Sequence, residues 1–266
     1  MKSTRLILTA ALVYIISIPT ASLADQKEIP FAVAEVFFEL NNTDGDLGIH
    51  ALIDGDPWKK LRIEDKRSRT MLDVTVRGRL RRQGLTEIFF ESAEPTFDEL
   101  TPETFFRRFP AGTYEVEGRT KSGKELESET EITHAMPAPA AALVNGIPAA
   151  MQCDDEEPGY DAPTVAGPVV ISWPPVIRTH PDLGHPRNSE DIAIHNYQVV
   201  VETELDGPGG EFASVLSVIL PPDVTALEIP AGFLAQNDTF KYEVLARESS
   251  YNQTALESCF LLKEGD

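Results

Sequence analysis

Two cysteines are the residues of this sequence with the most defined chemistry. Cys153 and Cys259 are its only cysteines, and neither belongs to a Cys-x-x-Cys pair or to a Cys/His spacing typical of a metal site. In an exported chain such a pair predicts a disulfide, and two unrelated thiols are the alternative. The bond would close a long loop and stabilise the fold by roughly a few kcal/mol in the loop-entropy model.

A basic segment at residues 59–82 runs against the charge of the rest of the chain, with ten Lys and Arg and three Asp and Glu. Alternation would place Arg77, Arg79 and Arg81 on one face of a strand, and likewise Lys60 and Arg62. Guanidinium groups fit sulfate, phosphate and carboxylate groups, which predicts a patch for an anionic ligand such as an acidic glycan. Pairing with the chain's own carboxylates is the simpler interpretation.

Three other polar groups could bind a metal ion but fit a simpler description. The acidic turn at residues 42–46 lacks the final Glu of an EF-hand loop, so a plain turn is favoured over a Ca²⁺ site. The acidic stretch at 153–157 is typical of a solvated linker. His180 and His185 lie in a Pro-rich loop with no third ligand nearby in sequence. We therefore predict no metal and no cofactor.

Enzymatic interpretations find little support in the sequence. It contains no Gly-x-Ser-x-Gly elbow, no His-Glu-x-x-His and no P-loop. Acidic residues are abundant enough for a paired-carboxylate glycosidase. Two domains of about 100 residues with no cleft-forming insertion make that the weaker interpretation. The prediction is that the protein is not an enzyme.

The first 24 residues have the composition of a secretory signal peptide. Lys2 and Arg5 precede an apolar run at residues 6–18, and small residues flank a cleavage position after Ala24. A membrane anchor is the alternative, but the run is shorter than the roughly 20 residues that span a bilayer. The sequence therefore predicts a secreted or periplasmic protein.

The charge of the mature chain limits its partners. Without residues 1–24 it carries 21 Lys and Arg against 43 Asp and Glu, a net charge of −22. This balance disfavours nucleic acid and anionic membranes. We expect a protein or polysaccharide partner, no nucleic acid, and no membrane insertion of the mature chain.

Composition divides the mature chain into two domains. Residues 135–150 read AMPAPAAALVNGIPAA, without an apolar period, and an acidic stretch follows. This predicts a linker at 135–161 between a β-rich domain at 26–134 and a second domain at 162–264.

The first domain is predicted to be strand-rich with one short helix. A turn is expected at Gly55-Asp56-Pro57, between two of its strands. Thr101 can cap the helix, and Phe105 with Phe109 would share a face that closes the end of a sandwich. The expected strands lie at 33–40, 49–53, 58–63, 71–77, 85–90, 114–119 and 125–133.

The second domain shows six alternating strands with room for a seventh before Val169, the pattern of an antiparallel sandwich. The segment VISWPP at 170–175, with Trp173, resembles the second strand of fibronectin type III domains. Tyr197 resembles the core position of their third strand, and Leu234 to Ala246 the run into their sixth. The resemblance covers about 100 residues and implies an immunoglobulin-like β-sandwich, so the whole chain is predicted to be all-β with two sandwich domains.

The resemblance departs from the family in one residue and implies little about function. Phe240 stands where these domains usually have the tyrosine of the tyrosine corner, so that hydrogen bond should be missing. Such domains act as spacers and binding modules, and the fold alone fixes no activity. The leading hypothesis is a non-catalytic exported binding or spacer protein. The alternatives are a carbohydrate-binding module using the basic patch or exposed aromatics such as Trp58, and an accessory subunit of an extracellular hydrolase.

Overall fold

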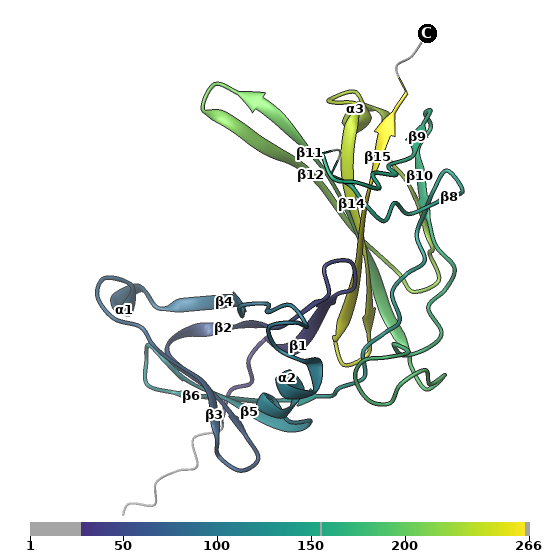
Figure 1. Ribbon diagram of the computed structural model, residues 1–266. Coiled ribbons are helices and arrows are strands. Elements are labelled where there is room, and N and C mark those ends of the chain that lie inside the picture. Colours follow the sequence, from purple (N-terminus) through teal and green to yellow (C-terminus); the bar gives the residue numbers. More distant parts are fainter. Residues whose placement is uncertain (1–27, 155, 264–266) are drawn as a thin grey trace, which may run out of the picture.

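The computed structural model describes residues 28–154 and 156–263, so the predicted signal peptide at 1–24 lies outside the described residues. Within them the chain is all-β, with fifteen strands and three short helices. Figure 1 shows two lobes that meet at an angle, and each has its own hydrophobic core. We call the lobe of β1–β6 the first domain and that of β7–β15 the second. The predicted all-β sandwich architecture is confirmed.

The first domain is a sandwich whose two layers share one bent strand, β2. The first half of β2 pairs with β1 and β4, and its second half pairs with β3 and β5. Large apolar side chains from both halves, including Trp58, fill the space between the layers. The strands are β1 Val33–Asn41, β2 Asp46–Asp65, β3 Thr70–Thr75, β4 Leu85–Glu91, β5 Gly112–Thr120 and β6 Glu125–Ile132.

The turn expected at Gly55-Asp56-Pro57 is wrong, because β2 runs through it as a single strand of 20 residues. These residues form a bend at which β2 changes partners, and the pairing with β4 shifts register between Asp54 and Trp58. Glycine and proline interrupt a ladder without ending the extended backbone when the strand bends there. The glycine and proline therefore mark the point where β2 passes from one layer of the sandwich to the other.

The predicted helix of the first domain is α2 Pro102–Arg108, and a second short helix, α1 Leu80–Gln83, was not predicted. Pro102 occupies the start of α2, but the Thr101 side chain does not cap it and instead contacts Thr104 Oγ1 at 3.0 Å. Phe105 and Phe106 are buried, with ring centroids 6.0 and 5.2 Å from that of Phe38. The helix therefore packs its aromatic side chains into the first core.

The second domain is a sandwich of two sheets. The larger sheet contains β12, β11, β14 and β15 in that order, and the smaller one contains β13, β10, β7 and β8. Trp173 packs edge-on against Tyr197 between them, at 5.2 Å. The elements are β7 Leu143–Val144, β8 Ile147–Pro148, β9 Thr164–Val165, β10 Val170–Ser172, β11 Ile194–Gly207, β12 Gly210–Leu220, β13 Ala226–Glu228, α3 Ala231–Leu234, β14 Thr239–Glu248 and β15 Gln253–Leu262.

The segment at 135–161 is not simply a linker, and this part of the prediction is wrong. Met136 is buried in the first core, whereas Ala140, Ala142 and Val144 are buried in the second. Strand β7 pairs with β10 although it lies within the predicted linker. The stretch before Val169, where the sequence left room for a seventh strand, contains β9, which pairs with β15. Small alanines pack closely under a sheet, and an apolar period cannot be read from so short a strand. The second domain therefore begins well before residue 162.

A tyrosine of the first domain makes a hydrogen bond like that of a tyrosine corner. Tyr114, near the start of β5, donates from its hydroxyl to the carbonyl of Pro110 four residues upstream, at 3.0 Å. In the second domain, the fully buried Phe240 ring stacks on Phe260 at 5.1 Å. Phe240 has no hydroxyl to donate, so the second domain has no hydrogen bond of this kind at that position.

Candidate functional site at the domain junction

Strand β1 of the first domain pairs in parallel with β15 of the second, which makes the junction between the domains a continuous sheet. Glu39 lies opposite Gln253, and Asn41 lies opposite Ala255. The strand order runs β12-β11-β14-β15-β1-β2-β5-β6 without interruption. Figure 1 shows β1 crossing towards β15 where the two lobes meet. Backbone hydrogen bonds therefore connect segments more than 200 residues apart in sequence.

Asn252, just before β15, holds three parts of the junction together. Its side-chain carbonyl accepts from the Phe38 backbone N–H at 2.9 Å. Its amide donates to the carbonyls of Thr133 and Ala135, at 3.1 and 3.2 Å. The residue is 1% exposed. An amide buried this deeply is stable only when its donors and acceptor are satisfied, so it fixes the crossover chain against β1.

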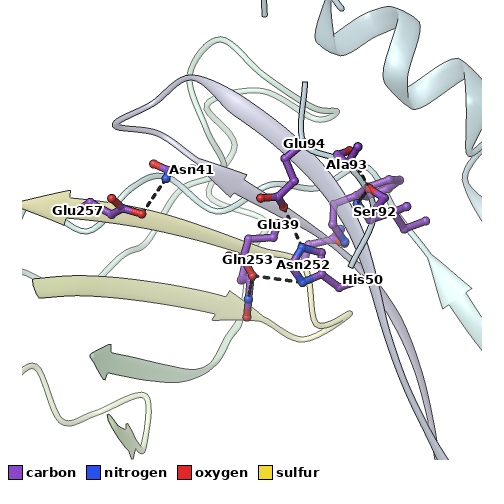
Figure 2. A network of polar contacts seen from close by, with 11 residues as sticks. Glu39, Asn41, His50, Ser92, Ala93, Glu94, Asn252, Gln253 and Glu257 are labelled. Atoms are coloured by element: carbon purple, nitrogen blue, oxygen red, sulfur yellow. Dashed lines mark hydrogen bonds and ion pairs between the residues drawn. The ribbon is translucent and has the colours of Figure 1, made fainter. Parts of the chain in front are cut away.

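A row of polar side chains crosses the junction from β14 to the loop after β4. Figure 2 labels four of its members, Gln253, Glu39, His50 and Glu94. Arg247 on β14 donates to Gln253 at 2.7 Å, and Gln253 donates to Glu39 on β1. Glu39 lies 3.6 Å from His50 Nδ1, and His50 Nε2 lies 2.9 Å from Glu94. The row joins β14 and β15 of one domain to β1, β2 and the loop after β4 of the other.

The apolar ring of Phe37 covers one end of this row, and a glycine makes room at the other. The Arg247 guanidinium lies 5.0 Å from the centroid of the Phe37 ring, a cation–π contact. At Gly48 a Cβ atom would collide with the carboxylate of Glu94. The missing side chain at residue 48 thus leaves the space that the Glu94 carboxylate occupies beside His50.

The turn at 42–45 docks on β15, which explains its polar sequence. The Asn41 side-chain carbonyl accepts from the backbone N–H groups of Thr43 and Asp44, at 3.0 and 3.1 Å. Thr43 Oγ1 in turn donates to the Glu257 carbonyl and accepts from the Glu257 N–H, at 3.1 and 2.9 Å. The turn that could have supplied Ca²⁺ ligands is thus a hydrogen-bonded turn fixed to the neighbouring domain.

The long loop at 176–191 forms a second bridge between the domains. His180 is 6% exposed; its Nδ1 accepts from the backbone N–H groups of Asp182 and Leu183. Nε2 therefore carries the proton and donates to the Asn42 side-chain carbonyl at 3.0 Å. Burial lowers the pKa of His180. Both ring nitrogens are used within the protein, which accounts for this histidine without a metal.

Gly184 allows the same loop to lie against the first domain. Its φ is +75°, a region that favours glycine, and a Cβ there would collide with the His134 carbonyl. His185 donates its backbone N–H to that carbonyl at 2.7 Å. Arg187 adds an ion pair with Glu103 of α2, at 3.2 Å. Loop and strand thus contact the first domain on two separate surfaces.

Carboxylates crowd the junction, and their pKa values are raised. Burial, reinforced by Glu39, Glu257 and other carboxylates, raises the pKa of Glu243 to about 8. Burial and the neighbouring Glu94 raise the pKa of Asp46 to about 6. Burial also raises the pKa of Glu39 and Glu257. The junction therefore stores electrostatic repulsion when it is fully ionised.

Cys153 and Cys259 form a disulfide, which fastens the chain after β8 to the last strand. Their Cα atoms are 5.8 Å apart, and 106 residues separate them in sequence. Cys259 is 4% exposed on β15, the strand that also pairs with β1. The bond therefore supports the element that carries the junction.

The predicted basic patch is split by the structure. Lys60 and Arg62 lie on β2, where Arg62 pairs with Asp73 and Glu64 at 3.2 and 3.3 Å. The strand face expected for the other three arginines is wrong, because β3 ends at Thr75 and Gly78 turns the chain into α1. These three are exposed in the β3–β4 connection: Arg77, Arg79 and Arg81.

The aromatic route to carbohydrate binding through Trp58 is also excluded. Trp58 is fully buried, and its indole N–H donates to the Thr86 carbonyl at 3.2 Å. It therefore belongs to the first core and offers no stacking surface.

The junction residues show what the sequence analysis missed. Asn252 and Gln253 were not singled out, although each is a large polar residue at most 4% exposed beside an alternating apolar strand. Polar residues at positions that alternation assigns to a core are the signal that could have identified them. Their partners on β1 could not be inferred, because parallel pairing over such a distance leaves no local pattern.

The arrangement is suited to holding domains together. His50 is 4% exposed and contacts carboxylates on both sides, so its ring is enclosed. In the described ranges, no group of three or more His, Cys, Asp or Glu is placed to hold a metal ion. None of the helices in the described part of the chain has the length and hydropathy needed to cross a bilayer.

Comparison with known proteins gives distant likenesses of fold. No family model matches the sequence, and no curated protein matches it. Among solved structures, it is similar to the fibronectin(III)-like modules of Clostridium thermocellum CbhA, with 11% identity and a TM-score of 0.28, over 88% of this chain and 95% of that one. A 1.5-MDa bacterial ice-binding adhesin gives 12% identity and a TM-score of 0.22, over 90% and 67%.

A third solved structure is a tetra-tandem repeat in the extending region of a large adhesion protein. It gives 12% identity and a TM-score of 0.27, over 87% of this chain and 50% of that one. The description of this chain as an all-β sandwich protein rests on its own strands and sheets.

Proposed function

We propose that this chain is a non-catalytic exported protein, secreted or periplasmic, that acts as a rigid spacer or binding protein. The pairing of β1 with β15 carries the proposal, because it makes one sheet of strands from both domains. Flexible linkers let domains move independently, whereas a shared sheet and a docked loop fix their relative orientation.

The positions of residues 28 and 263 support a spacer role. Residue 28 lies beside β6 at the far end of the first domain, because Ile29 exchanges backbone hydrogen bonds with Glu125 and Glu127. Residue 263 follows β15 and bonds to Val165 at the far end of the second. Figure 1 shows β6 in one lobe and β15 in the other. A chain attached at both ends would therefore hold its attachments apart.

Pulling on the two ends of a single molecule tests this proposal. We expect the extension to stay constant at low force and then to increase in steps as whole domains unfold. Gly184→Ala should add an early step, because the substitution displaces the 176–191 loop from His134. Gly209→Ala is the matched control, since open space surrounds that glycine. A gradual lengthening of the wild-type protein before any unfolding step would contradict a rigid spacer.

A second candidate function is binding of an anionic polysaccharide through the arginines of the β3–β4 connection. Among the described residues, Arg77, Arg79 and Arg81 take part in none of the ion pairs, in contrast to Arg62. Exposed guanidinium groups without partners are available to sulfate or carboxylate groups. These three residues therefore support the anion-binding hypothesis better than Arg62 does.

A sulfated polysaccharide column measures this second function. The triple variant Arg77→Gln/Arg79→Gln/Arg81→Gln should elute at clearly lower salt than the wild type, since each lost phosphate-like contact weakens the salt-dependent attraction. Arg62→Gln should elute with the wild type. Equal elution of the triple variant and the wild type would count against this function.

A further inference from the structure

The two outer edges of the large sheet differ in their protection. At one end is β6, whose exposed side chains include four glutamates, and residue Ile29 already pairs with it. At the other end is β12, with eleven residues and one charge, Glu211. Natural proteins protect exposed edges with charge, proline or cover, because an open edge pairs with further strands. The described residues contain nothing that pairs with the outer edge of β12.

The side chains of β12 are also more apolar than a solvated edge requires. Phe212, Val215 and Ile219 are exposed to 53, 54 and 64%. The strand pairs with β11 along its whole length, so its register within the sheet is fixed. Half of its backbone N–H and C=O groups point outward, away from β11. The edge thus offers both hydrogen-bonding groups and apolar surface to a strand of matching length.

We propose that β12 is a self-association site at which a second copy of this chain adds its own β12 in antiparallel orientation. The charge pattern favours this occupant. Two copies of this chain repel each other because each carries a large negative charge. Contact through β12 keeps this repulsion small, since the strand of each copy contains only one carboxylate. Pairing of β12 with a β6 edge would instead meet four glutamates. The assembly therefore closes as a two-fold dimer and does not extend into a filament.

A register that overlaps all eleven residues places Val215 on the two-fold axis. Glu211 then lies opposite Ile219 of the second copy, so no two like charges face each other across the strands. Phe212 lies opposite Val218 of the second copy, whose neighbours Leu216 and Leu220 pack on the second core. The pairing gives each exposed Phe212 an apolar neighbour.

Sedimentation equilibrium of the mature protein tests the proposal. We expect a monomer–dimer equilibrium that Val215→Lys weakens by at least about tenfold, because it places two lysines opposite each other on the axis. The surface control is Ile177→Lys, which alters an isoleucine 64% exposed outside β12 and should leave the dimer unchanged. Thermal melts should show that both variants remain folded, since both positions are exposed.

Cysteine cross-linking tests the register itself. Val215→Cys should form an interchain disulfide on mild oxidation, because residues on the axis of an antiparallel pair come within disulfide distance. Ile177→Cys should not. If sedimentation gives the mass of a single chain at every concentration up to about 0.1 mM, the proposal is overturned, because the dimer would then be weaker than a dissociation constant of that size. A dimer that survives Val215→Lys or fails to cross-link through Val215→Cys would overturn it as well.

Discussion

Gly48 leaves the space through which Glu94 reaches His50, and this single position controls one end of the polar row. Gly48→Ala should push the Glu94 carboxylate away and break its 2.9 Å contact with His50. We expect a loss of about 1 kcal/mol in the free energy of unfolding, the usual net worth of one intramolecular hydrogen bond. Chemical denaturation measures it. The control is Gly209→Ala, where a Cβ meets nothing and the backbone φ lies outside the left-handed region.

Tyr114 provides a second test at the residue scale. Tyr114→Phe removes the hydroxyl that donates to the Pro110 carbonyl and leaves the ring in place. The expected loss is about 1 kcal/mol, which lowers the melting temperature by about 2–4 °C in a chain of this size. Tyr160→Phe, at an exposed tyrosine, should leave the melting temperature unchanged. Equal melting temperatures for Tyr114→Phe and the wild type would show that this hydrogen bond contributes nothing.

At the scale of elements, local patterns predicted strands well where both neighbours are close in sequence. The alternation through β11 and β14 identified the buried positions Tyr197, Val199, Tyr242 and Val244, because side chains of a half-buried strand alternate. The glycine in the short loop after β5 predicted a hairpin, and the antiparallel pairing of β5 with β6 confirms it.

Elements whose neighbours are distant in sequence were misjudged. Strand β2 was expected as two strands because glycine and proline at its bend also signal turns. Strand β7 lies in a Pro- and Ala-rich segment, and its role emerges only from pairing with β10. The β1–β15 pair has no local signal at all, because its contacts join opposite ends of the chain. The candidate site therefore could not be predicted from the sequence.

The disulfide is the covalent support of β15, and its removal is an element-scale prediction. The double variant Cys153→Ser/Cys259→Ser should lose about 2–4 kcal/mol of unfolding free energy, because the long loop is no longer closed in the unfolded chain. Wild-type protein in reductant should lose the same amount. Mass spectrometry that finds two free thiols in the native protein would contradict the bond itself.

At the scale of the whole molecule, the crowded carboxylates make stability depend on pH. The pKa of Glu243 is raised to about 8 in the folded state from an ordinary value of 4.5, and that of Asp46 to about 6 from 3.8. The folded state thus binds more protons than the unfolded chain, so this stability is fully present below about pH 4. It is lost as the pH rises through 6 and then 8.

Thermal melts between pH 5 and pH 8 measure this effect. Glu243→Gln should raise the melting temperature at pH 8 by about 3–6 °C, equivalent to about 1–2 kcal/mol, and flatten its decline with pH. The control Glu129→Gln alters an exposed glutamate on β6 and should leave the profile unchanged. A wild-type melting temperature that rises from pH 5 to pH 8 would refute the assigned sign.

The fixed orientation of the two domains is the central claim, and a distance between spin labels tests it most directly. Labels at Ser122→Cys, in the β5–β6 loop, and Asp223→Cys, before β13, lie on exposed positions of different domains. Labels at Ser122→Cys and Thr86→Cys lie within the first domain and give the reference width. We predict a single interdomain distance as narrowly distributed as the reference. A broad or multiple distribution would contradict a junction held by β1 and β15.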